Sequence, residues 1–120
     1  MWKFRDAVHH ALEGIGFAFT NERSLRYQFA IFLIAIVAGL YFQISSDEFL
    51  AILLISCLVF SLELINTAIE KSMDIIGNGE YSEKIKIVKD ISAGAVLLAA
   101  CFAAFVGITI FLPRLMELLK

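Results

Sequence analysis

The 120-residue chain has little charge, a single proline and only two cysteines. Charged residues make up 18% of it and hydrophobic residues 60%, whereas soluble globular domains contain about 45–50% apolar residues. This composition excludes a disordered chain and an ordinary water-soluble domain. The net charge of -2 gives no basic excess for neutralising phosphates, so we expect no binding to nucleic acid. A single-domain integral membrane protein over residues 1–120 is the class that remains.

Familiar motifs of metal and nucleotide sites are also missing. Cys57 and Cys101 lie within apolar runs and form no CxxC pair, which excludes a structural zinc site and a disulfide scaffold. No glycine precedes Lys-Ser or Lys-Thr, and Gly77 and Gly79 lack the third glycine of a dinucleotide loop. No GxSxG, HExxH, HRD or DFG motif occurs. Phosphate chemistry in this chain would depend on scattered carboxylates that hold a metal ion.

Hydrophobic periodicity predicts an all-α membrane protein. Apolar residues recur at helical spacing over residues 3–20, which predicts an amphipathic helix on the membrane surface, with Trp2 at headgroup depth. Uncharged runs over residues 27–46, 49–62 and 91–113 predict three transmembrane helices at about residues 27–46, 49–72 and 90–113, because about 20 helical residues span the hydrocarbon core. A polar turn over residues 45–48 and a solvated loop over residues 73–89 would connect them.

Small and basic residues predict packing and orientation. A small residue at every fourth position of the last helix favours close approach of another helix; these are Ala95, Ala99, Ala103 and Gly107. The amino-terminal segment and the 73–89 loop carry most basic residues, whereas the 45–48 turn has none. We therefore expect the amino-terminal segment and the 73–89 loop to be cytoplasmic.

Four polar residues follow one stripe of the second predicted transmembrane helix. They are spaced three, four and four apart: Glu63, Asn66, Glu70 and Asp74. Ionisable groups in a membrane segment commonly cost about 3 kcal/mol each on insertion scales and face a bundle interior or a cavity. Glu70 and Asp74 alone could be the solvated end of a helix. Glu63 lies among apolar neighbours, which favours a functional site.

Other polar residues permit two interpretations. Lys89 and Asp90 would begin and cap the last helix, or Lys89 would reach an anionic ligand above the second. Glu22 would be a surface residue unless a ligand draws it inward. His9 and His10 lack further histidines or cysteines nearby in the sequence, so we interpret them as interfacial polar residues.

The polar residues together resemble the signature of the prokaryotic diacylglycerol kinase family, which includes undecaprenol kinases. The segment from Glu63 to Glu70, then Asp74, then the segment from Lys89 through Val96 carry the resemblance. Asn21 and Glu22, followed by Arg26, are similar to the family's motif before its first membrane helix. The resemblance covers nearly the whole chain.

The resemblance implies a homotrimer in the bacterial plasma membrane, with active sites between protomers that transfer the γ-phosphate of MgATP to a lipid hydroxyl. It implies Glu63 as general base, and Glu22 and Glu70 as magnesium ligands. Residues implied to organise the phosphates and the catalytic carboxylate are Asn66, Lys89 and Asp90. Residues implied to contact ATP are Lys3, His10, Glu80, Tyr81 and Ser82.

Several positions depart from the enterobacterial pattern. Lys3, His10 and Ser82 stand where an arginine, a tyrosine and a histidine are expected, and the loop around Gly77 and Gly79 is one residue longer. Ala93, in place of a serine, is similar to the branch that uses undecaprenol, although diacylglycerol stays open as the acceptor. The alternatives from other classes are a small multidrug or ion transporter that protonates Glu63, and a non-catalytic membrane scaffold.

Overall fold

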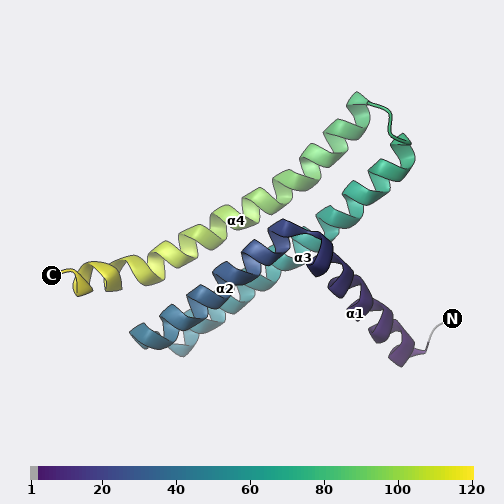
Figure 1. Ribbon diagram of the computed structural model, residues 1–120. Helices are drawn as coiled ribbons and strands as arrows, with labels where there is room; N and C mark the ends of the chain where they lie inside the picture. Colours follow the sequence, from purple (N-terminus) through teal and green to yellow (C-terminus); the bar gives the residue numbers. More distant parts are fainter. Residues whose placement is uncertain (1–2) are drawn as a thin grey trace.

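The computed structural model describes residues 3–120 as four helices joined by short turns (Figure 1). The helices are α1 (Phe4–Asn21), α2 (Arg23–Phe42), α3 (Ser46–Gly77) and α4 (Glu83–Leu118). The predicted all-helical class is confirmed. Trp2, placed by the sequence at the start of the surface helix, lies outside the described residues.

Three of the helices, α2, α3 and α4, are long and apolar enough to cross a membrane. In Figure 1, α3 and α4 form one long antiparallel pair, and α2 packs along the half of α3 that begins at Ser46. The α1 helix leaves this bundle near the middle of α3. The chain therefore consists of a three-helix bundle at one end and a two-helix extension at the other.

The length of α3 and α4 corrects the prediction of a solvated loop over residues 73–89. At 1.5 Å per residue, these helices of 32 and 36 residues are about 48 and 54 Å long, well beyond the hydrocarbon core of about 30 Å. Within residues 73–89, only the five residues between Gly77 and Glu83 are non-helical. The charged residues mark where the apolar layer ends, whereas the helices continue past it.

The start and end predicted for the last helix are also wrong. Ser82 is the N-cap of α4, and its hydroxyl accepts a hydrogen bond from the Ile85 amide at 3.5 Å, so Asp90 lies inside the helix. At the other end, α4 continues through Pro113 to Leu118. A proline removes one backbone donor, and the last turns of a long helix tolerate this loss better than its centre.

Left-handed residues form the turns. Gln43 ends α2 with φ 54°, and Asn78 ends α3 with φ 49°, followed by Gly79 at φ 81°. Asparagine and glycine adopt this region at least cost, which explains why α3 stops at this point. The α1–α2 junction has a different form, because Glu22 is extended and its amide donates to the Ala18 carbonyl at 2.8 Å.

The Arg26 side chain holds the α1–α2 junction. Its guanidinium Nη1 donates to the carbonyls of Phe19 and Thr20, at 3.0 and 2.6 Å, in the last turn of α1. These carbonyls have no acceptor role within the helix, so a cation at this point satisfies them and complements the helix dipole. Position on a membrane surface remains a prediction for α1, although most of its residues are exposed.

A small apolar core lies at the end of the bundle where α2 meets α3. Ile44, Ile52 and Ile110 are buried there and draw residues from all three long helices. Gly39 permits this packing, because an added Cβ would lie 2.8 Å from the Phe49 ring. Most other large apolar side chains are exposed, as is typical of a surface that faces lipid or another subunit.

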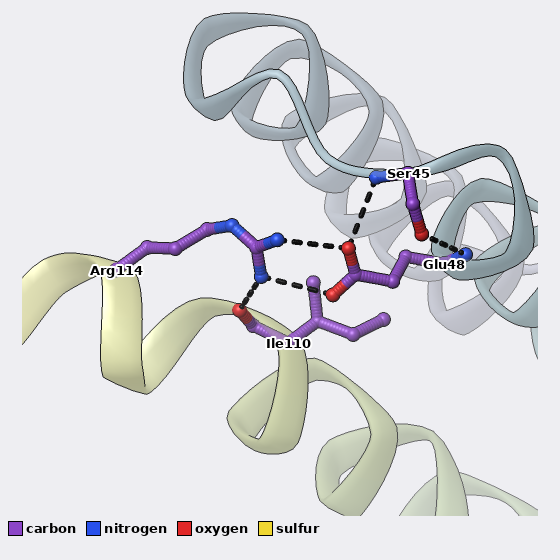
Figure 2. A network of polar contacts seen from close by, with 4 residues as sticks. All are labelled: Ser45, Glu48, Ile110 and Arg114. Atoms are coloured by element: carbon purple, nitrogen blue, oxygen red, sulfur yellow. Dashed lines mark hydrogen bonds and ion pairs between the residues drawn. The ribbon is translucent and has the colours of Figure 1, made fainter.

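A charge pair joins α3 to α4 at this same end, which we call the outer clamp (Ser45, Glu48 and Arg114; Figure 2). The Arg114 guanidinium donates to both oxygens of Glu48, at 2.8 and 2.9 Å, and to the Ile110 carbonyl at 2.7 Å. Glu48 also accepts from the Ser45 amide, in a reciprocal capping box that starts α3. Both carboxylate oxygens are therefore satisfied by donors that lie far apart in sequence.

Candidate active site

Glu63 is buried near the middle of α3, with 6% of its surface exposed. Ser24 Oγ donates to its Oε1 at 2.6 Å, and Gln28 Nε2 donates to its Oε2 at 3.3 Å. Both donors come from the first turns of α2, where residues four apart share one helix face. The α2 helix thus presents one hydrogen-bond donor to each oxygen of the Glu63 carboxylate.

The surroundings of Glu63 are unusual for a buried acid. Buried carboxylates are normally paired with a cation, because the loss of hydration is expensive. Within residues 3–120, no lysine, arginine or histidine forms an ion pair with Glu63. Its hydrogen-bond donors are a neutral hydroxyl and a neutral amide, so its charge is oriented without being neutralised.

Asn66 lies one helical turn beyond Glu63 and is 7% exposed. Its Nδ2 donates to Glu70 Oε1 at 3.3 Å, which confirms that the predicted stripe brings these two residues together. Asn66 Oδ1 is buried and has no hydrogen-bond partner in the part of the chain described here. Such a group costs about 1–3 kcal/mol in a finished interior, so its presence suggests a ligand-binding role.

Glu22 reaches the same turn of α3 from the α1–α2 junction. Lys71, next to Glu70 in sequence, lies 3.8 Å from Glu22 Oε1, and the Glu22 side chain is 27% exposed. The Lys71 ammonium also lies 5.3 Å from the centroid of the Phe17 ring. Glu22 therefore lies beside α3, paired with Lys71, and a ligand role for it stays a prediction.

The last turns of α3 and the first turns of α4 carry the remaining polar residues. Lys89 Nζ donates to Asp74 Oδ1 across the two helices, and Lys86 Nζ donates to Asp90 Oδ2 at 2.6 Å along α4. A cavity of about 370 Å³ opens there; it is lined by Met73, Asp74, Gly77, Gly79, Glu80, Tyr81, Ile85 and Lys89. Lys89 therefore faces this cavity, whereas Asp90 is paired on the α4 surface with 62% of its side chain exposed.

An apolar groove of about 500 Å³ runs on the other side of Glu63, between α2, α3 and α4. Phe32, Ile52 and Phe60 are among its lining residues, and so are Ala103 and Gly107 of the predicted small-residue stripe. Gln28 is the residue that both lines this groove and contacts Glu63. The groove and the carboxylate are thereby connected through one amide side chain.

The sequence matches a known protein family. The family model of the prokaryotic diacylglycerol kinases matches residues 9–111. The chain belongs to this family. A diacylglycerol kinase from Synechocystis sp. is 38% identical over 113 residues, covering 94% of this chain and 65% of that protein. An undecaprenol kinase from Bacillus subtilis is 34% identical, covering 94% and 91%, and a diacylglycerol kinase from Escherichia coli is 34% identical, covering 81% and 79%.

Membership of the prokaryotic diacylglycerol kinase family confirms the predicted enzyme class, a lipid kinase. The chain spans 65% of the length of the Synechocystis relative. The three apolar helices and the prokaryotic family fit a bacterial membrane protein. Neither the transporter nor the scaffold alternative is favoured by these relatives.

The residues expected to contact the nucleotide of a diacylglycerol kinase are divided between two places. Glu80 and Tyr81 line the cavity at the α3–α4 turn, and Ser82 caps α4 beside it. Lys3 and His10 are exposed at and near the start of α1, where His10 Nδ1 lies 3.2 Å from Glu13. In Figure 1 this part of α1 and the α3–α4 turn point away from one another, so one copy of the chain does not bring the two groups together.

The carboxylates fit the hard oxygen donors that magnesium prefers. Across residues 3–120, no group of three or more acidic, histidine or cysteine side chains could hold a metal ion. Magnesium commonly takes one or two carboxylates and completes its shell with water and substrate phosphates. Glu70, held by Asn66, and Glu22, held near Lys71, could supply such a pair.

Two residues of this site have no counterpart in the sequence-based prediction. Ser24 and Gln28 were not expected to contact Glu63. The helix over residues 27–46 was predicted from its lack of charge, without attention to single polar residues such as Gln28, and Ser24 lies before that range. A signal was nevertheless present. Two polar side chains four residues apart, at the start of an apolar helix, share a face and need a common partner.

Proposed function

We propose that the protein is a membrane lipid kinase that transfers the γ-phosphate of ATP to the hydroxyl of a lipid alcohol, undecaprenol or diacylglycerol. The single observation that carries the proposal is the buried Glu63 carboxylate, oriented by neutral donors between an apolar groove and the polar residues of α3. A lipid chain can lie in the groove while its hydroxyl meets the carboxylate. The nucleotide can approach from the polar side.

Glu63 acts as the general base in this proposal. It accepts the hydroxyl proton as the lipid oxygen forms its bond to the γ-phosphorus, and the bond from that phosphorus to the β–γ bridging oxygen breaks, releasing ADP. Among residues 3–120, each carboxylate oxygen receives one hydrogen bond, which leaves a lone pair on either oxygen for the proton. Base catalysis of this kind contributes about 10²- to 10⁴-fold.

Glu22 and Glu70 would hold magnesium in the proposed site. The bound ion would supply positive charge that offsets the negative charge developing during transfer. Asn66 positions Glu70 through its amide and has a free acceptor for a further donor. Lys89 faces the cavity where the phosphates would enter. Asp90 would help to organise the phosphates through Lys86, with which it is paired on α4.

The nucleotide site is completed by a second copy of the chain, and we propose a homotrimer. Glu80 and Tyr81 line the cavity at the α3–α4 turn and Ser82 is the N-cap of α4 beside them, whereas Lys3 and His10 lie at and near the start of α1. A composite site between protomers brings the two groups together. Large exposed side chains such as Leu97 and Phe105, at 66% and 68%, provide an apolar surface for subunit contact.

The apolar groove supports a lipid acceptor. It is open and almost entirely apolar, so it suits the hydrocarbon chain of any lipid alcohol. We propose a plasma membrane location in bacteria, with the amino-terminal helix and the α3–α4 turn on the cytoplasmic side, where ATP is present. The basic residues near these elements support this orientation.

The decisive experiment follows the label from γ-³²P-ATP into lipid extracted from proteoliposomes that contain undecaprenol or diacylglycerol. We expect wild-type protein to produce a phosphorylated lipid with at least one of them. Glu63→Gln should lower turnover by about 10³-fold while the affinity for MgATP stays the same. Glu117→Gln is the matched control, because Glu117 is an exposed glutamate in the last turn of α4.

Two outcomes would contradict the proposal. The first is the absence of labelled lipid with both alcohols, together with proton-coupled flux in the absence of ATP, which would indicate a transporter. The second is a Glu63→Gln variant that loses MgATP binding but keeps its rate of chemistry, since a general base acts on the reaction and not on nucleotide affinity.

A further inference from the structure

We propose that Ser24 and Gln28 of α2 are positioning residues that fix the orientation of the Glu63 carboxylate for proton transfer. The inference rests on the proposed function, because it assigns these two residues a role in the action of Glu63 as base. They supply both of the hydrogen bonds that Glu63 receives from described residues.

The geometry is that of a two-point hold. Ser24 Oγ lies 2.6 Å from Oε1 and Gln28 Nε2 lies 3.3 Å from Oε2. A carboxylate held at one oxygen can still rotate about its last bond, whereas one held at both oxygens is fixed in plane and direction. Fixing the base in a reactive geometry is valuable, since a displacement of about 1 Å can cost about 10²-fold in rate.

The local fold explains why α2 can provide this hold. Ser24 and Gln28 are four residues apart, in the first two turns of a helix that begins at Arg23. Arg26 donates to the carbonyls of Phe19 and Thr20, and these hydrogen bonds fix the start of α2 relative to the end of α1. The two donors are therefore presented from a helix start that is itself held by hydrogen bonds.

A purely structural role explains these two residues poorly. Ser24 is exposed, and its hydrogen bond to a carboxylate adds little apolar burial to α2. Gln28 is half-buried, and its Oε1 has no hydrogen-bond partner among residues 3–120, which is a cost to the folded state. A leucine at position 28 would suit the groove better, so the amide is best explained by its contact with Glu63.

The experiment measures steady-state kinetics of lipid phosphorylation for Ser24→Ala, Ser24→Thr and Gln28→Met. We expect Ser24→Ala and Gln28→Met each to lower kcat about tenfold, with the KM for MgATP unchanged. Ser24→Thr keeps the hydroxyl and should restore kcat to within about twofold of wild type. Thr109→Val, which removes a hydroxyl that bonds only to the Phe105 carbonyl on α4, is the control and should keep full activity.

A double-mutant cycle distinguishes positioning of Glu63 from an independent effect. Glu63→Asp withdraws the carboxylate by one methylene, beyond reach of the two donors, and should leave a low but measurable rate. In that background Ser24→Ala should change kcat by less than about twofold, because the interaction it removes is already lost. A tenfold loss in both backgrounds would overturn the proposal.

Failure of this inference can be told apart from failure of the proposed function. If wild-type protein phosphorylates lipid and Glu63→Gln does not, the function stands. The positioning role is then overturned by wild-type kcat in both Ser24→Ala and Gln28→Met. A raised KM for the lipid with unchanged kcat would equally overturn it, because it would make these residues part of lipid binding. Circular dichroism and melting temperature identify variants that fail to fold. If Gln28→Met fails to fold, the comparison of Ser24→Thr with Ser24→Ala decides the question.

Discussion

The outer clamp and the surroundings of Glu63, near the middle of α3, use charged residues in opposite ways. At the outer clamp, Glu48 and Arg114 satisfy one another in a two-point pair, reinforced by Ser45 and a backbone carbonyl (Figure 2). Around Glu63, the acid has neutral partners, and two buried oxygens, on Gln28 and Asn66, have no partner among residues 3–120. Saturated polar groups stabilise a fold, whereas unsaturated ones cost stability and remain available for chemistry.

Asn66→Leu should have the largest effect on turnover among the substitutions that test this comparison. It removes a buried acceptor without a partner, so the melting temperature should stay the same or rise, although one hydrogen bond to Glu70 is lost. Turnover should fall about a hundredfold, because Glu70 loses its support. Melting curves and lipid phosphorylation test both statements. A variant that melts several degrees lower but keeps its turnover would make Asn66 a structural residue.

Removal of the proposed magnesium ligands is expected to have the next largest effect. Glu70→Gln and Glu22→Gln should each raise the magnesium concentration for half-maximal activity by about tenfold or more, since second-sphere changes alone cost about that much. The measurement is a magnesium titration at saturating ATP and lipid. Identical titration curves for wild type and variants would exclude both residues as ligands.

At the outer clamp we expect the reverse pattern. Arg114→Ala should lower the melting temperature by several degrees, because it leaves Glu48 without its partner, while kcat stays near wild type at temperatures where the variant is folded. Lys120→Ala is the matched control, because its pair with Glu117 is 3.8 Å long and exposed. Loss of kcat in a folded Arg114→Ala protein would show that the outer clamp is coupled to the Glu63 site.

The smallest predicted effect concerns Ser82. Its hydroxyl is used as the α4 N-cap, so Ser82→Ala should raise the KM for ATP only about twofold, through fraying of the first turn of α4. Ser82→Asn keeps a capping oxygen and should match wild type. An increase of tenfold or more in both variants would instead indicate a direct contact between the hydroxyl and the nucleotide.

The helices themselves were predictable, because long uncharged runs leave few alternatives to membrane-crossing segments. Their ends were not. Charges between Met73 and Lys89 suggested a loop, yet a helix outside the apolar layer accepts charged residues readily, and most of this stretch is helical. The same reason misplaced Asp90, which was assigned to a helix start and lies within α4.

The contacts of the candidate site were also predictable only in part. Residues on one helix, such as Asn66 and Glu70, were brought together by spacing alone, and their contact is confirmed. Contacts between helices were missed, since nothing in the spacing connects Ser24 to Glu63 or Glu48 to Arg114. Such pairs depend on how the helices pack, and a single sequence carries little information about that.

The excess length of α3 and α4 bears on how two incompatible substrates could meet. ATP dissolves in water and a lipid alcohol dissolves in oil, so neither can cross fully into the other's phase. Under the proposed function, an antiparallel pair that continues beyond the α1–α2 junction would carry a polar cavity into the aqueous side while its other half would stay among acyl chains. Under the proposed function, Glu63 stands at the boundary between the two solvents, and each substrate travels only as far as that level.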